Sequence, residues 1–184
     1  MSRLILVRHG EAAASWSEDP DPGLSLAGHQ QAAAVAEALA ARWPEPLPIV
    51  VSPLRRTRET AAALERRWGA PARVEPAVGE IPTPEATLKE RAGWLHLLLQ
   101  STWDQAEAFV QEWRRQVLDA LHAIPTDSVV VTHFVVVNLA VGAAGGDLRV
   151  RAFSPAYCSE TVIETSGDGI EVVQLGAEAT TMVR

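Results

Sequence analysis

The sequence contains one cysteine and no long apolar run. Because Cys158 has no second cysteine to pair with, an internal disulfide is excluded and a reducing compartment is expected. The apolar run Leu4–Val7 is too short for the core of a signal peptide, and no stretch approaches the roughly 18 apolar residues of a membrane helix. We therefore expect a cytoplasmic protein that has no membrane partner.

An excess of positive charge is also missing. The 184 residues include 16 Lys and Arg against 23 Asp and Glu, which gives a formal net charge of -7 at pH 7. Nucleic acids and anionic membranes require a basic face, so a general binder of either is not expected, although a local group of arginines could still bind a small anion. The cations are nearly all arginine and alanine is abundant, which fits a GC-rich bacterial genome. Composition leaves the oligomeric state open.

Three common catalytic patterns are absent from the sequence. The glycines form no P-loop, and there is no Gly-x-Ser-x-Gly nucleophile elbow. Three of the histidines, His29, His96 and His122, fall in expected helices without the spacing of metal ligands. These absences argue against a P-loop nucleotidase, a serine hydrolase and a histidine-based metal site.

The pattern of apolar residues predicts a single α/β domain over residues 1–184. Hydrophobic residues make up 47% and charged residues 21%, an ordinary globular composition. Continuous apolar runs are typical of strands buried on both faces, and weaker or alternating runs indicate edge strands. The expected strands are Leu4–Val7, Ile49–Val51, Arg73–Glu75, Ser128–Thr132, and a hairpin of Glu160–Thr165 and Ile170–Leu175 around Ser166–Gly169. The expected helices are Leu26–Trp43 capped by Ser25, Ser52–Trp68 ended by Gly69, Glu85–Gln100, Asp104–Ile124 and Phe134–Ala144.

This order of elements favours a three-layer α/β/α fold with a mostly parallel sheet and an antiparallel strand at one edge. The segment from about Ala77 to Trp113 is expected to form a helical region over the edge of the sheet that carries the active site.

Charged residues follow three of the expected strands. Arg8 and His9 come directly after the first strand, Arg55 and Arg56 open the helix after the second, and His133 follows Ser128–Thr132. The carboxyl ends of parallel strands lie along one edge of a sheet, where ligands bind, so we expect these side chains to meet there.

The chemistry of these side chains suits a phosphoryl group. Arginine donates bidentately to phosphate oxygens and stays charged, and helix N-termini add further N–H donors. An unprotonated histidine nitrogen can attack phosphorus, and nearby guanidinium groups favour the neutral imidazole. The second histidine can donate to a phosphoryl oxygen.

At these residues the sequence resembles the histidine phosphatase superfamily, the phosphoglycerate mutase-like enzymes. The resemblance rests on four stretches in the family's order, namely Leu6–Glu11, Leu24–Ala32, Ser52–Ala61 and Val130–His133. It implies a three-layer α/β fold, a phosphohistidine on His9, and no metal or cofactor. The family's phosphate-binding arginine maps to Arg56 and not to Arg55, which we interpret as a surface residue.

The resemblance also implies the remaining site residues. Arg8, Arg56 and His133 would bind phosphate, and Ser15 would take the place of the family's asparagine. The family's general acid is a glutamate in a Leu-x-Glu-Ile context, which points to Glu80 within Val78–Ile81. The sequence departs from the family at Phe134, which stands where glycine usually follows the second histidine.

We interpret the chain as a phosphomonoester hydrolase, metal-independent, acting on a small phosphorylated metabolite. Phosphoryl transfer of the phosphoglycerate mutase type is one alternative. A phosphohistidine-protein phosphatase, or a weakly active phosphate-binding regulatory module, is another.

Overall fold

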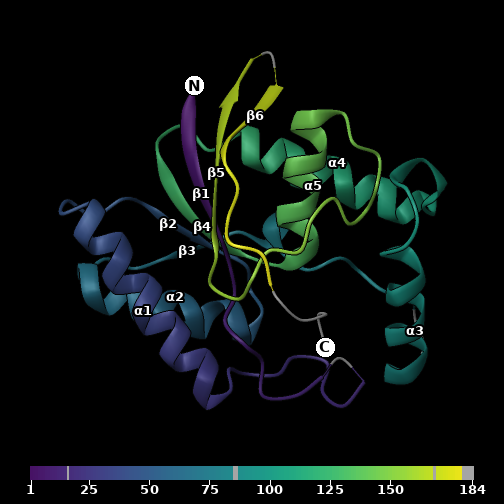
Figure 1. Ribbon diagram of the computed structural model, residues 1–184, viewed down its shortest axis with the longest axis horizontal. Helices are drawn as coiled ribbons and strands as arrows, with labels where there is room; N and C mark the ends of the chain where they lie inside the picture. Colours follow the sequence, from purple (N-terminus) through teal and green to yellow (C-terminus); the bar gives the residue numbers. More distant parts are fainter. Residues whose placement is uncertain (16, 85–86, 168, 180–184) are drawn as a thin grey trace.

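A computed structural model describes residues 1–15, 17–84, 87–167 and 169–179. Its centre is a six-stranded sheet in the order β3-β2-β4-β1-β5-β6 (Figure 1). The strands, in chain order, are β1 (Ser2–Arg8), β2 (Ile49–Val51), β3 (Arg73–Val74), β4 (Ser128–Thr132), β5 (Glu160–Ser166) and β6 (Gly169–Gln174).

The sheet is parallel on one side and antiparallel on the other. Strand β4 pairs in parallel with both β1 and β2, and β2 pairs in parallel with β3. Strand β5 runs antiparallel to β1, and β6 runs antiparallel to β5. This confirms the expected mixed sheet. The hairpin expected between β5 and β6 is present, although Asp168 in its turn lies outside the described residues.

Helices cover both faces of the sheet because successive residues of its buried strands point to opposite sides. On β1, Leu4 and Leu6 belong to a core shared with α4 (Ala108–His122) and α5 (Phe134–Gly145). Ile5 and Val7 belong to a second core shared with α1 (Leu26–Arg42) and α2 (Arg55–Trp68). Figure 1 shows these two pairs of helices on either side of the sheet. The helices are α1 (Leu26–Arg42), α2 (Arg55–Trp68), α3 (Leu88–Leu98), α4 (Ala108–His122) and α5 (Phe134–Gly145), with short 3₁₀ turns η1 (Pro76–Val78) and η2 (Trp103–Gln105).

Local signals mark two of the expected helix ends. The Ser25 hydroxyl accepts from the Gly28 N–H and caps α1, as expected. Gly69 has φ 65° and ends α2, again as expected.

Two helices begin later than the sequence predicts. Helix α2 begins at Arg55 and not at Ser52, so Pro53 precedes the helix and is not in its first turn. The turn η2 precedes α4, so that helix begins at Ala108 and not at Asp104. Helix α3 begins after a capping box formed by Thr87 and Glu90. The expected start of that helix, at residues 85–86, lies outside the described residues.

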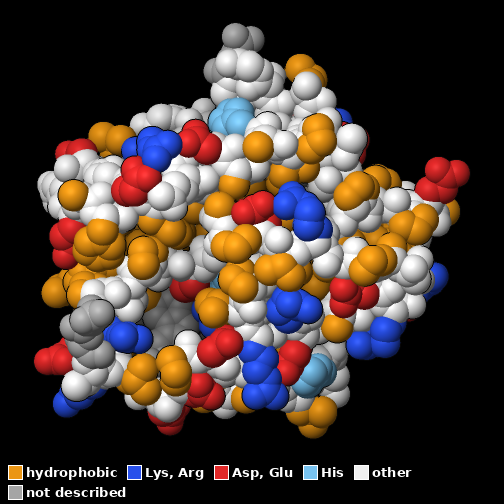
Figure 2. Space-filling view, turned by 180° about the vertical axis from the view of Figure 1, so that it is seen from behind, with side chains coloured by type: hydrophobic (Ala, Val, Ile, Leu, Met, Phe, Trp, Pro, Cys, Tyr) orange, Lys and Arg blue, Asp and Glu red, His pale blue; other side chains and the backbone are white. Residues whose placement is uncertain are grey.

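None of the described helices combines the length and the apolar character that crossing a bilayer requires. Acidic and basic side chains are interspersed on the face of the molecule drawn in Figure 2, with apolar side chains between them.

Candidate active site

The ends of β1, β2 and β4 meet at one edge of the sheet, as the sequence predicts. Arg8 lies opposite Thr132 in the register of β1 and β4. The backbone continues this pairing, because the His9 N–H donates to the Thr132 carbonyl at 2.9 Å and the Ser52 N–H donates to the Val131 carbonyl at 3.1 Å. His9, Ser52 and His133 are thereby held beside one another by main-chain hydrogen bonds.

His9 is fixed in one tautomer. Its Nδ1 lies 2.7 Å from the Gly10 carbonyl oxygen, which can only accept, so Nδ1 carries the proton. Its Nε2 accepts from the Arg56 Nε–H at 3.2 Å and is therefore unprotonated. Burial lowers the pKa of His9 well below its ordinary value, and the positive charges of Arg56 and Arg8 lower this pKa further. The imidazole is neutral at pH 7, with a lone pair on Nε2.

The turn after His9 packs closely on helices α1 and α2. The Gly10 N–H donates to the Thr60 hydroxyl at 3.0 Å, and that hydroxyl donates to the Arg56 carbonyl at 2.8 Å. A Cβ on Gly10 would lie 2.7 Å from the Gly28 carbonyl oxygen, so this turn requires glycine. Glu11 accepts from the Ser25 hydroxyl at 2.7 Å and is engaged in holding the loop to α1.

Arg56 is the centre of the site. Its side chain is 2% exposed. Its Nε lies against His9, and its Nη2 lies 3.2 Å from His133 Nδ1 and 3.5 Å from a Glu80 oxygen. Its Nη1 is buried without a hydrogen-bond partner among the described residues, and the carboxylate of Asp21 lies 3.8 Å away.

His133 is completely buried at the start of α5. Its Nε2 lies 2.7 Å from the Ser52 hydroxyl, while its Nδ1 faces Arg56. Because Arg56 can only donate, Nδ1 accepts in this arrangement and Nε2–H donates to Ser52. Burial, followed by the charge of Arg56, lowers the pKa of His133 well below its ordinary value. Its ring centroid lies 5.4 Å from that of His9.

Glu80 lies beside both Arg56 and His133. One carboxylate oxygen is 3.5 Å from Arg56 Nη2 and 3.5 Å from His133 Nδ1, and the other accepts from the Ile81 N–H at 3.0 Å. The preceding turn η1 is tied to β4, since the Thr132 hydroxyl donates to the Val78 carbonyl at 2.7 Å. Burial raises the pKa of Glu80, although Arg56 partly opposes this. A raised pKa suits a group that must hold a proton before delivering it.

Arg8 is buried beneath the site and contacts two aromatic rings. Its Cζ lies 4.0 Å from the centroid of Tyr157 and 5.2 Å from that of Phe134. One terminal nitrogen donates to the Pro155 carbonyl at 2.7 Å, and Nε has no hydrogen-bond partner among the described residues. Burial lowers the pKa of this guanidinium.

Two further residues of the sequence prediction lie apart from this cluster. Arg55 is exposed and donates to Glu59 at 2.7 Å, which agrees with its interpretation as a surface residue. The Ser15 hydroxyl lies 2.6 Å from a Glu18 carboxylate oxygen and makes no hydrogen bond to the cluster in the described part of the chain. A phosphate contact by Ser15 stays a prediction, and it would require this hydroxyl to leave Glu18.

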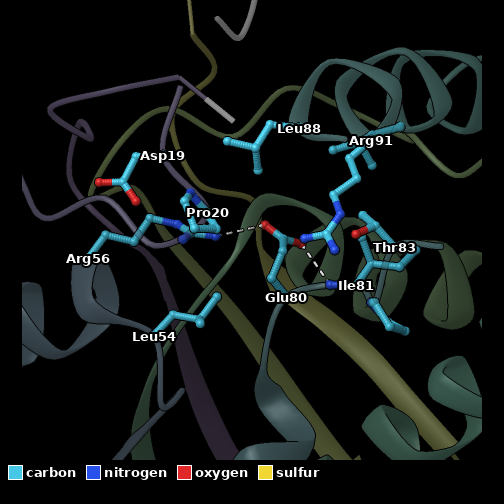
Figure 3. A pocket seen from close by; sticks show the side chains of 11 residues that line it. Asp19, Pro20, Leu54, Arg56, Glu80, Ile81, Thr83, Leu88 and Arg91 are labelled. Carbon is cyan, nitrogen blue, oxygen red and sulfur yellow. Dashed lines mark hydrogen bonds and ion pairs between the residues drawn. The ribbon is translucent and has the colours of Figure 1, made fainter. Parts of the chain in front are cut away.

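A pocket of about 200 Å³ opens beside Arg56 and Glu80. Figure 3 shows Asp19, Pro20 and Leu54 around Arg56, Leu88 of α3 above Glu80, and Arg91 of α3 on the side of Glu80 away from Arg56. The expected helical region thus contributes one wall of the pocket.

Sequence patterns did not single out Tyr157, Asp19 or Arg91 as functional. Tyr157 is the one tyrosine of the chain, and this rarity is the sequence feature that could have drawn attention to it. Asp19 lies in a polar loop, and Arg91 is one of many arginines, so only the fold brings them to the site.

The described residues include no group of three or more His, Cys, Asp or Glu side chains arranged to hold a metal ion. Burial raises the pKa of the Cys158 thiol to about 12, so this cysteine is a weak nucleophile at neutral pH.

Comparison with known proteins identifies one family whose model matches most of the chain. The model of the histidine phosphatase superfamily (branch 1) matches residues 4–178. A glucosyl-3-phosphoglycerate phosphatase of Mycolicibacterium vanbaalenii is 42% identical over 82 residues, which cover 42% of this chain and 36% of that relative. This alignment therefore spans little more than a third of the relative.

Two solved structures share the fold. Bacillus stearothermophilus YhfR superposes with a TM-score of 0.76 at 20% identity, covering 94% of this chain and 96% of that one. An Entamoeba histolytica phosphoserine phosphatase, solved with 3-phosphoglyceric acid, superposes with a TM-score of 0.73 at 19% identity, covering 96% of this chain and 98% of that one.

Proposed function

This chain belongs to the histidine phosphatase superfamily, and from that premise we propose that it hydrolyses small phosphomonoesters through a phosphohistidine on His9. One observation carries the proposal. An unprotonated His9 Nε2 faces a buried arginine cluster in which Arg8 Nε and Arg56 Nη1 have no hydrogen-bond partner among the described residues. Buried donors without partners are costly, and an anion with several oxygens, such as a phosphoryl group, would satisfy them.

In the first step, the Nε2 lone pair of His9 forms a bond to phosphorus while the bond from phosphorus to the leaving oxygen breaks. Glu80 supplies the proton that the leaving oxygen needs. Arg56 and Arg8 stabilise the charge on the remaining phosphoryl oxygens. The fixed Nδ1–H of His9 aims the ring, because rotation would break its hydrogen bond to Gly10.

In the second step, water attacks the phosphohistidine and Glu80 takes up the proton of that water. The N–P bond breaks, inorganic phosphate leaves and His9 returns to its neutral form. His133 completes the phosphate site. A bound dianion would raise the pKa of this buried imidazole, and a protonated Nδ1 would then donate to a phosphoryl oxygen.

The size of the pocket supports a small substrate. A space of about 200 Å³ can hold a small leaving group but not a folded protein. Two of the proteins named above are a glucosyl-3-phosphoglycerate phosphatase and a phosphoserine phosphatase, and both of these substrates are small phosphomonoesters. The proposed chemistry assigns no step to a metal ion, so activity on p-nitrophenyl phosphate should survive dialysis against EDTA. Loss of activity that a divalent cation restores would contradict this part of the proposal.

The experiment that tests the proposal is His9→Ala, with His122→Ala as a matched control because His122 is exposed on α4. We expect His9→Ala to lose at least about 10³-fold in kcat on p-nitrophenyl phosphate, and His122→Ala to retain the wild-type rate. The wild-type enzyme quenched during turnover should carry an acid-labile, alkali-stable phosphate label, and His9→Ala should carry none. Comparable activity of His9→Ala would refute the nucleophile. Release of inorganic phosphate, counted against any phosphorylated second acceptor, separates hydrolysis from mutase-type transfer.

A further inference from the structure

Arg91 is a cation of the pocket that the proposed chemistry does not use. It lies in the first turn of α3, and Leu88 and Leu95 flank it on the same helix face at spacings of three and four residues. Figure 3 shows its side chain extending from α3 towards the space beside Glu80 and Thr83. Arg91 therefore lines the part of the pocket beyond the general acid.

The guanidinium of Arg91 is not neutralised by the described part of the protein. Its Nε is buried without a hydrogen-bond partner, and its side chain makes no hydrogen bond or ion pair to any described residue. Glu80, the nearest acid in Figure 3, directs its carboxylate to Arg56 and to its own neighbour Ile81. Several arginines outside the pocket, such as Arg55 and Arg149, are instead paired with a carboxylate.

The order of groups along the pocket indicates what Arg91 meets. In the proposed chemistry the phosphoryl group is bonded to His9 Nε2 and contacts the Arg56 guanidinium, and the leaving oxygen must lie next to Glu80 to receive its proton. Substituents on the leaving group then extend past Glu80 to Arg91. A partly buried guanidinium between two leucines attracts an anion strongly, and its planar fork matches a carboxylate.

We propose that Arg91 is a specificity-determining residue that binds a carboxylate on the leaving group, so that the preferred substrates are phosphate monoesters of hydroxy acids. The inference rests on the proposed phosphatase function. Arg56 and Arg91 are the two cations that line this pocket, and Arg56 is engaged with the phosphoryl group. A single remaining arginine matches a monoanionic carboxylate better than a second phosphoryl dianion, which would require further donors.

Matched substrate pairs test this inference. O-phosphoserine differs from O-phosphoethanolamine by a carboxylate, and 3-phosphoglycerate carries a carboxylate where glycerol 3-phosphate has a hydroxymethyl group. We expect wild-type kcat/KM to favour the carboxylate member of each pair by about 10- to 100-fold, the value of one charge-assisted contact. For a compound turned over too slowly to measure, its inhibition constant against p-nitrophenyl phosphate hydrolysis gives the same ratio.

Three variants then isolate the contact. In Arg91→Gln the ratio of kcat/KM between the carboxylate substrate and its partner should fall at least about tenfold. Arg91→Lys should retain part of this preference, because lysine keeps the positive charge but lacks the planar guanidinium. In Lys89→Gln, which removes an exposed cation from the same helix, the ratio should stay at the wild-type value. A general loss of structure would lower kcat/KM for both substrates of a pair and leave the ratio of the two values unchanged.

Two results would overturn the inference. One is a wild-type ratio near one, and the other is an equal ratio in wild type and Arg91→Gln. Either leaves the phosphatase proposal intact if His9 is required for p-nitrophenyl phosphate hydrolysis. Failure of wild type to release phosphate from any of these esters would instead count against the phosphatase proposal itself.

Discussion

Glu80→Gln separates general acid catalysis from mere positioning. The glutamine has nearly the same shape as glutamate and can still accept from the Ile81 N–H, but it has no acidic proton to deliver. The need for that proton depends on the leaving group. An alkoxide is a poor leaving group and requires protonation, whereas p-nitrophenolate leaves readily without it.

The expected effect is therefore unequal between substrates. General acid help is worth roughly 10²–10⁴ in rate, or about 3–5 kcal/mol of barrier. We expect Glu80→Gln to lose this factor in kcat/KM on an alkyl phosphate, and to lose less than about tenfold on p-nitrophenyl phosphate. Glu45→Gln removes an exposed acid and serves as the control that leaves both rates unchanged.

The pH dependence supplies a second measurement. Burial raises the pKa of Glu80, and the acid is active only in its protonated form below that pKa. The wild-type rate on an alkyl phosphate should therefore fall as the pH rises through this raised pKa, and Glu80→Gln should lack that fall. An equal loss on both substrates, with an unchanged pH profile, would refute the acid role and leave Glu80 as a partner of Arg56.

Three further outcomes follow from the same geometry. Arg56→Lys keeps a charge but loses the nitrogen pair that contacts His9 and His133, so kcat should fall about 10²–10³-fold; a loss below tenfold would contradict the central place of Arg56. Tyr157→Leu removes the ring against Arg8 and should weaken competitive inhibition by vanadate about 3- to 30-fold, whereas unchanged inhibition would show that the ring does not hold Arg8 in place. Below pH 6.5, the ordinary pKa of histidine, the unfolded chain binds protons at His9 and His133 while the folded chain does not, since both have lowered pKa values. The stability that these neutral imidazoles provide is thus complete above pH 6.5 and is lost as the pH falls below it. Tm should therefore decrease from pH 7 to pH 5, and the decrease should be smaller in His133→Asn. An equal decrease of Tm in wild type and His133→Asn would contradict this role of His133.

The main features of the site could be predicted from sequence because they depend on backbone position. His9 and His133 each follow a continuous apolar run, and such runs become neighbouring parallel strands whose ends coincide. Arg56 lies in the first turn of α2, directly after β2. The apolar runs mark the strand ends locally, and Arg56 follows β2 within a few residues, so short motifs suffice to place these three residues at one edge of the sheet.

The wall of the pocket formed by α3 could not be predicted in this way. Arg91 reaches the pocket because α3 packs beside Glu80, and the position of α3 depends on contacts among segments far apart in sequence. Likewise, α2 begins at a different residue from the one the sequence predicts, because a tertiary contact takes the place of a local cap at its start. At Arg55 the backbone N–H donates to Asp21 of a distant loop, and the N-cap residue Leu54 makes no side-chain cap.

Phe134 shows how a departure from the family pattern can be compatible with the same chemistry. Its ring is 2% exposed, and the Arg8 Cζ lies 5.2 Å from the ring centroid. Burial weakens the hydration of that guanidinium and lowers its pKa. Aromatic faces attract a cation without occupying its N–H donors, so Phe134 and Tyr157 can help to retain the charge of Arg8 while its Nε stays free of any partner among the described residues. A hydrogen-bonding side chain at position 134 would stabilise the same charge, but it would occupy a donor that the proposed phosphate binding needs.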